Sequence, residues 1–196
     1  MSTDRDAQVT ESSRPLRADA VRNRARVLDV AYETFAAEGL SVPIDEIARR
    51  AGVGAGTIYR HFPTKDALFR AVLKDRMQRV VDDGYALLES DEPGVALFTF
   101  LRSIVLQWGA TDRGLAEALA GVGIDIAQAA PESEDAFLAV LGELLGAAQR
   151  AGIARGDLGV GDVKAILVGC QAMQSYNAAS AERVIDVVID GLRAPQ

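Results

Sequence analysis

A group of hydrogen-bond donors and small residues is concentrated between residues 55 and 65. The group consists of Ala55, Gly56, Thr57, Tyr59, Arg60, His61 and Lys65. These residue types suit duplex DNA, because Arg60 can donate hydrogen bonds to guanine and Thr57 can contact a thymine methyl group or a phosphate. The small residues allow the backbone to approach DNA closely, and Lys65 can contact a phosphate. The segment therefore predicts a nucleic-acid interface.

The sequence around this group predicts a helix-turn-helix. We expect short helices at about 44–51 and 55–62, with Gly52 ending the first helix and Gly54 and Gly56 bracketing a tight turn. Ile47 lies on the face of the first helix that should turn inward. Two short helices joined by a glycine-containing turn form a unit whose second helix reads the major groove.

Longer helices are expected on both sides of this unit. The preceding helix, at about 19–38, carries apolar residues at helical spacing: Val27, Leu28, Ala31 and Phe35. The following helix starts near Thr64, a candidate cap, and runs to about residue 88. Further helices are expected at about 94–109, 113–127, 133–151, 162–178 and 181–193. No strand-like alternation persists, so the predicted fold is all-α, with an N-terminal three-helix helix-turn-helix head, a C-terminal helical bundle and about nine helices in total.

Charge is distributed unevenly along the 196 residues. The net charge is −7. Residues 14–80 carry 13 Lys and Arg against 8 Asp and Glu, whereas residues 81–196 carry 7 against 17. A basic N-terminal part on an acidic body fits a protein that presents one face to nucleic acid, although surface composition could produce the same asymmetry by chance.

Several other classes of protein find little support in the sequence. Cys170 is the single cysteine and His61 the single histidine, so we expect no intramolecular disulfide, no metal site and no cofactor. We also expect no catalytic triad and no glycine-rich phosphate loop, and hence no enzyme. The chain has no signal peptide pattern and no run of 18 apolar residues, which predicts a cytoplasmic protein without a membrane span.

The helix-turn-helix segment resembles a known family. The run AGVGAGTIYRHFPTKDALF, which ends at Phe69, resembles the helix-turn-helix signature of the TetR (tetracycline-repressor) family, and the likeness extends upstream to Ala31, Phe35 and Gly39. The resemblance implies that Thr57, Tyr59, Arg60, His61 and Lys65 contact DNA. In the family, the positions of Tyr59 and His61 usually hold phosphates, and the position of Arg60 more often touches bases. A weaker likeness, in the segment AQRAGIARGDLGVGDV that ends at Val163, is to actinobacterial-type members.

One position departs from the family pattern. Many members carry a Thr or Ser cap that touches phosphate at the start of the first short helix. The matching residues here are Val42 and Pro43, and Pro43 has no N–H group to offer. Ser41 is the candidate replacement for this cap.

The resemblance also implies how the whole molecule works. It implies a homodimer in which helices at about 163–177 and 181–192 form the interface, a palindromic operator in double-stranded DNA, and an unidentified small-molecule effector that releases the protein. The domain division that the resemblance implies is a disordered arm at 1–17, a DNA-binding domain at 18–63 and a ligand-binding and dimerisation domain at 64–196. Candidates for contact with the effector are Phe98, Gln107, Trp108, Cys170, Met173 and Tyr176, although aromatic residues, Met and Cys of this kind more often belong to the core than to a pocket.

Other functions remain open from the sequence. The protein could be a ligand-independent or activating DNA-binding regulator, in which case no ligand would abolish operator binding. It could be a nonspecific nucleoid-type protein, with nearly equal affinity for all DNA. It could also be a helical enzyme or carrier that has such a head, which catalytic turnover would reveal.

Overall fold

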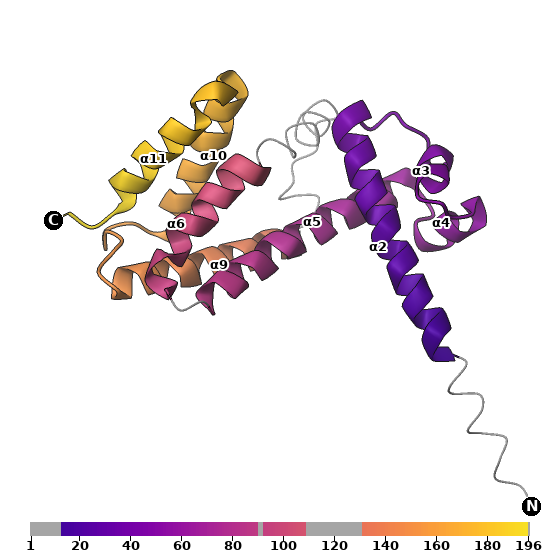
Figure 1. Cartoon of the computed structure of the whole chain (residues 1–196), viewed down its shortest axis with the longest axis horizontal. Helices are drawn as coiled ribbons and strands as arrows, with labels where there is room; N and C mark the ends of the chain where they lie inside the picture. Colours follow the sequence, from indigo (N-terminus) through magenta and orange to yellow (C-terminus); the bar gives the residue numbers. More distant parts are fainter. Residues whose placement is uncertain (1–12, 90–91, 109–130, 196) are drawn as a thin grey trace, which may run out of the picture. The chain divides into compact units, whose positions relative to one another are not determined.

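The computed structural model of the chain describes residues 13–89, 92–108 and 131–195 (Figure 1). Its helical elements are α2 (Ser13–Glu38), α3 (Ile44–Arg50), α4 (Ala55–His61), α5 (Lys65–Leu88), α6 (Pro93–Ser103), the π-helix η1 (Ile104–Trp108), α9 (Pro131–Arg150), α10 (Val160–Tyr176), the short 3-10 helix η2 (Ala178–Ser180) and α11 (Ala181–Leu192). Extended pairing within the described residues is limited to one antiparallel bridge between Ala154 and Arg193. The predicted all-α fold is confirmed.

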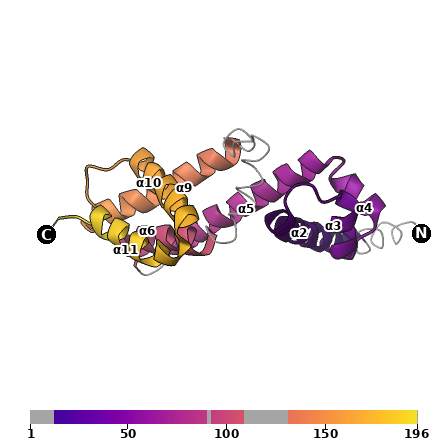
Figure 2. The same cartoon turned by 90° about the horizontal axis from the view of Figure 1, so that it is seen from above.

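The chain forms two compact units, residues 1–72 and 73–196, and the division falls within α5. In the first unit, α2 packs on α3, and α3 packs on α4 (Figures 1 and 2). Apolar side chains from α2, α3, α4 and the first part of α5 are buried in its core: Val27, Leu28, Ala31, Phe35, Ile47, Ala48, Ile58, Leu68, Phe69 and Val72. The rings of Phe35 and Phe69 meet edge to face with centroids 5.8 Å apart, which is a favourable aromatic geometry. The expected inward face of the first long helix is therefore confirmed.

Glycine conformations and a side-chain cap account for where the first helices end and begin. At Gly39 and Gly52 the backbone has φ values of 75° and 65°, which are accessible to glycine without strain. The hydroxyl of Thr64 accepts a hydrogen bond of 3.1 Å from the N–H of Ala67, so Thr64 caps α5 as predicted. Helix α2 begins at Ser13, six residues before the predicted start at Asp19, so residues 13–17 of the expected disordered arm are helical. The rest of that arm, residues 1–12, lies outside the described part of the chain.

The second unit is a bundle in which α6 packs on α9, and α10 packs on both α9 and α11 (Figure 2). Its core is built from Leu, Val, Phe and Ile side chains, among them Leu97, Phe100, Leu101, Val140, Leu141, Leu144 and Ile185. The predicted helix at 94–109 continues as a π-helix from Ile104, a local change of pitch that apolar periodicity does not reveal. The helix predicted at 113–127 lies outside the described residues. None of the described helices is both long and apolar enough to cross a bilayer.

The C-terminal residues are tied to the loop between α9 and α10. The N–H of Arg155 donates to the carbonyl of Leu192 over 3.0 Å, and the N–H of Ala194 donates to the carbonyl of Ile153 over 2.8 Å. The amide of Gln149 donates to the carbonyls of Arg155 and Leu158 within the same loop. These bonds satisfy loop backbone groups that would otherwise lack partners.

Candidate nucleic-acid interface

Helix α4 is a short helix whose one buried residue is Ile58. The exposed residues of this helix are Ala55, Gly56, Tyr59, Arg60 and His61, and Thr57 is half-buried. Tyr59 is 43% exposed, which excludes a core role for its ring in the isolated chain. Six residues of the predicted group thus lie on α4, five of them exposed, and the seventh, Lys65, is the first residue of α5.

The turn between α3 and α4 is held by backbone hydrogen bonds. The N–H of Val53 donates to the carbonyl of Ala48 over 3.0 Å, and the N–H of Gly52 donates to the carbonyl of Arg49 over 3.2 Å. Gly54 is the N-cap residue of α4 and has an extended conformation. Because these bonds and the burial of Ile58 fix α4 against α3, the exposed side chains of α4 are carried by a rigid support.

The start of α3 has no side-chain cap. Pro43 occupies the N-cap position, and its carbonyl accepts hydrogen bonds from the N–H groups of Glu46 and Ile47, at 3.2 and 3.3 Å. The suggestion that Ser41 caps this helix is wrong, because Pro43 takes the position and has no side-chain acceptor. The side chain of Ser41 is exposed.

Carboxylates neutralise many of the arginines in the first unit. Arg49 and Arg50 both bind Glu46, and Arg50 also binds Glu38, which lies twelve residues away in sequence. The hydrogen bonds from Arg49 and Arg50 lower the pKa of Glu46 from 4.5 to about 2. Glu38, Glu46, Arg49 and Arg50 therefore pair with one another. The two arginines are thus not free to bind DNA.

Two of the cationic residues predicted to contact DNA, Arg60 and Lys65, differ from Arg49 and Arg50 in that they form no such ion pairs within the described part of the chain. Among the described residues, no carboxylate pairs with Arg60 or Lys65. Partial burial lowers the pKa of Lys65. The pKa of Tyr59 is raised, chiefly by burial and then by the negative charge of Asp45 and a hydrogen bond to it. Arg60 on the exposed face of α4 and Lys65 at the start of α5 thus keep cations of the kind that bind base edges and phosphates, whereas the hydroxyl of Tyr59 is hydrogen-bonded to Asp45.

Sequence reasoning missed Arg26 on α2. Its Nε donates a 2.8 Å hydrogen bond to the carbonyl of Ala51, the residue that ends α3. The sequence carries no signal for this contact, since the acceptor is a backbone carbonyl 25 residues away. The residue joins α2 to the helix-turn-helix.

The four candidate effector residues whose side chains the structure describes are not gathered in one place. Phe98 on α6 and Cys170 on α10 are buried in the core of the second unit, and burial raises the pKa of the Cys170 thiol. Met173 and Tyr176 lie on the exposed surface of α10, where Tyr176 is 93% exposed. Gln107 and Trp108 belong to η1, but their side chains lie outside what the structure describes.

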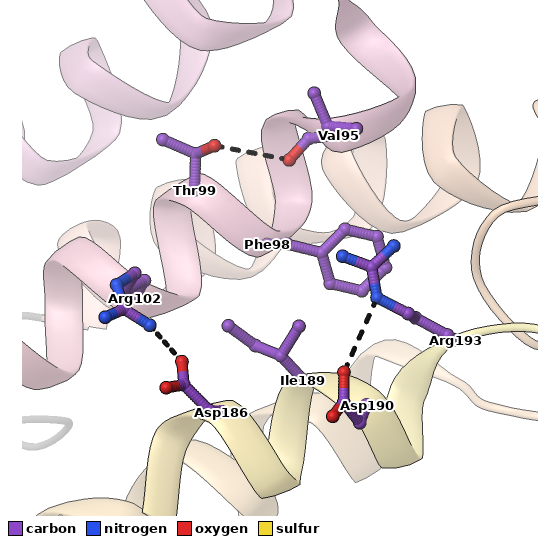
Figure 3. Close-up of a pocket in the computed structure, with 8 residues that line it drawn as sticks. All are labelled: Val95, Phe98, Thr99, Arg102, Asp186, Ile189, Asp190 and Arg193. Atoms are coloured by element: carbon purple, nitrogen blue, oxygen red, sulfur yellow. Dashed lines mark hydrogen bonds and ion pairs between the residues drawn. The ribbon is translucent and has the colours of Figure 1, made fainter. Parts of the chain in front are cut away.

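Phe98 lines a groove of about 440 Å³ between α6 and α11 (Figure 3). The guanidinium of Arg193 lies over the Phe98 ring at 4.8 Å from its centroid. Across the groove, Arg102 of α6 forms an ion pair with Asp186 of α11. The groove therefore combines an aromatic wall with charged groups of both signs.

Two family profiles match the chain. The profile described as "Bacterial regulatory proteins, tetR family" matches residues 27–72, and the profile described as "Transcriptional regulator SbtR-like, C-terminal domain" matches residues 92–194. The first covers α3, α4 and the candidate interface, and the second covers just over half of the chain.

Solved structures resemble about nine-tenths of the chain. A TetR transcription regulatory protein from Mycobacterium vanbaalenii is 59% identical, with a TM-score of 0.77, over 92% of this chain and 100% of that one. A TetR transcriptional regulator from Streptomyces coelicolor is 35% identical, with a TM-score of 0.73, over 88% of this chain and 99% of that one.

Curated relatives match by sequence over a shorter stretch. The HTH-type transcriptional regulator SrpR from Pseudomonas putida is 43% identical over 65 residues, which are 33% of this chain and 30% of that protein. This chain therefore matches only about a third of the length of the curated relatives.

Proposed function

Because the chain belongs to the TetR family of bacterial transcriptional regulators, we propose that it is a homodimeric repressor released from a palindromic operator by a small molecule. Its site of action is the cytoplasm, where bacterial DNA lies, and its function is binding rather than catalysis. The domains are an N-terminal arm at 1–17, a DNA-binding domain at 18–63 and a ligand-binding and dimerisation domain at 64–196.

The observation that carries the proposal is the exposed face of α4. It presents Thr57, Tyr59 and Arg60 beside small residues that permit close approach to DNA, and Arg60 has no carboxylate partner among the described residues. In this assignment Arg60 reads a base edge in the major groove, since an unpaired guanidinium can bond to guanine. Tyr59, His61 and Lys65 hold phosphates and set the register of the helix on the duplex.

Helices α10 and α11 supply the dimer interface in this proposal. They pack against one another and leave large apolar side chains in water, with Val168 56% and Val187 72% exposed, together with Met173 and Tyr176. A second copy of the chain that covers these residues would remove their apolar surface from water. Two recognition helices related by a two-fold axis would then read half-sites about 34–36 Å apart, or a multiple of that spacing.

The effector acts in the second unit. Of the residues expected to contact it, Phe98 lines the groove between α6 and α11, which is the site we propose for its entry, whereas Met173 and Tyr176 belong to the proposed dimer interface. The effector needs only to bind one arrangement of the dimer more tightly than another, because differential affinity shifts the population. A regulator that is ligand-independent or activating is the alternative.

The decisive experiment is a selection of binding sequences from random duplex DNA with the purified protein at fixed salt. Enrichment of a palindrome with half-sites near one helical turn apart supports the dimeric regulator. Adding candidate effectors to the selected duplex then separates a ligand-released repressor from a ligand-independent protein. Failure to enrich any sequence, while random DNA is bound in a salt-dependent way, would contradict specific recognition.

A further inference from the structure

Arg24 lies on the exposed surface of α2, next to the end of the recognition helix α4. Its guanidinium carbon is 5.6 Å from the centroid of the Phe62 ring. Phe62 is the residue that ends α4, and its ring is 6.2 Å from that of His61. A residue nearly forty positions earlier in the sequence is therefore brought to the edge of the predicted DNA-binding face.

Arg24 differs in its charge pairing from Arg22 and Arg70, whereas Arg26 on the same helix likewise has no carboxylate partner among the described residues and donates to the carbonyl of Ala51 and to Asn23. Arg22, two residues earlier on the same helix, pairs with Asp19, and Arg70 on α5 pairs with Asp66 at 2.8 Å. Within the described residues Arg24 has no carboxylate partner. The positive charge of Arg24 therefore lies near the Phe62 ring and is not neutralised by a carboxylate of the described residues.

The contact with Phe62 suits a residue that also binds an anion. A guanidinium can stack its flat face on an aromatic ring while the N–H groups at its edge stay free to donate. Such an edge matches the oxygens of a phosphate, which it can bind with two parallel hydrogen bonds. Stacking on a buried ring also limits the conformations that the side chain must give up on binding.

We propose that Arg24 binds a DNA phosphate beside the C-terminal end of α4, and so extends the DNA-binding surface from α4 and α5 to α2. The contact is sequence-independent, because a phosphate carries no base identity. This assignment rests on the proposed DNA-binding function. It adds a residue that the helix-turn-helix pattern does not contain.

The test compares Arg24→Gln with Arg22→Gln as a matched control on the same helix. Affinity is measured by fluorescence anisotropy over a series of salt concentrations, on the selected operator and on a scrambled duplex of about 30 base pairs, which can hold two half-sites. We expect Arg24→Gln to weaken binding about fivefold per bound subunit at about 0.15 M salt, and to reduce the slope of log K against log salt by about 0.9 per subunit. The loss should be the same on both duplexes, Arg22→Gln should leave both quantities unchanged, and Arg24→Lys should keep most of the slope.

Different results overturn different parts of the argument. If the unaltered protein binds both duplexes and Arg24→Gln keeps its affinity and slope, the phosphate contact is wrong and the DNA-binding function stands. If Arg24→Gln weakens binding with an unchanged slope and a lower melting temperature, Arg24 acts only by covering Phe62, and the assignment also fails. If the unaltered protein binds neither duplex, the proposed function itself fails.

Discussion

The side chain of Arg26 donates a 2.8 Å hydrogen bond from Nε to the carbonyl oxygen of Ala51, and so joins α2 to the residue that ends α3. This bond satisfies a carbonyl at the end of a helix, where no N–H of the helix itself can reach. It also places a positive charge at the negative end of the α3 dipole. The turn that leads into α4 is therefore anchored from outside the helix-turn-helix.

Removal of this anchor should destabilise the first unit. We expect Arg26→Ala to lower the free energy of unfolding by about 1–2 kcal/mol, as for the loss of a partly buried hydrogen bond to a charged group. Urea unfolding followed by circular dichroism measures the change. Arg22→Ala is the control, because its exposed ion pair with Asp19 should contribute little. Equal stability of the two variants would contradict the anchoring role.

Arg60 and Lys65 should respond differently to truncation. Arg60→Ala should relax the preference for one base pair in each half-site and cost about 1–3 kcal/mol on the selected operator. Lys65→Ala should weaken operator and scrambled DNA alike, because it loses only a phosphate contact. Binding titrations on both duplexes measure the two losses. An equal loss for Arg60→Ala on operator and scrambled DNA would refute its base-reading role.

The ion pairs of Glu46 should make the first unit sensitive to acid. The pKa of Glu46 is lowered from 4.5 to about 2 in the folded protein, so the unfolded chain takes up this proton at higher pH. The stabilisation is complete above pH 4.5 and is lost as the pH falls towards 2. Glu46→Gln should thus be less stable than the unaltered protein at neutral pH, and the gap should narrow over this acid range.

The measurement for Glu46 is the urea midpoint as a function of pH. Glu33→Gln, which changes an exposed carboxylate on α2, should follow the unaltered protein throughout. A gap between Glu46→Gln and the unaltered protein that stays constant down to the lowest pH would show that the ion pairs do not stabilise the fold.

Gly84 allows α5 to approach its neighbours in the second unit. A β-carbon at this position would lie 2.7 Å from Cγ2 of Val140 and 3.1 Å from Cε2 of Phe100. We expect Gly84→Ala to lower the free energy of unfolding by about 1–3 kcal/mol, because added atoms in a packed core force side chains to move. Thermal unfolding measures the effect. Gly142→Ala on α9, where a β-carbon meets nothing within 4 Å, should instead stabilise by about 0.5–1 kcal/mol.

The substitution Val168→Glu tests the proposed dimer interface on α10 and α11. A glutamate at this position would place a charge in each copy of the interface, and we expect the dissociation constant of the dimer to rise on the order of a hundredfold, or about 2.7 kcal/mol. Sedimentation at several concentrations measures this change. Val21→Glu on α2 is the matched control, since Val21 is as exposed as Val168 and lies in the other unit. Dimers of unchanged strength in Val168→Glu would place the interface elsewhere.

The sequence by itself determined where most of the described helices lie and which residues of α4 are chemically suited to DNA, but not the first turns of α2 or the π-helix at Ile104–Trp108. Apolar spacing identified the buried face of α2 through Leu28 and Phe35, and Gly39 and Gly52 identified helix ends, because both signals are local.

Only the tertiary structure decided which cations are free and which are neutralised. Arg50 pairs with Glu38 from another helix, whereas Arg24 meets the ring of Phe62 and keeps its charge available. The groove between α6 and α11 likewise joins Phe98 to Arg193, residues far apart in the chain. Helical periodicity specifies the face on which a side chain lies but not the partner that packing brings to it, so these relationships required the folded molecule.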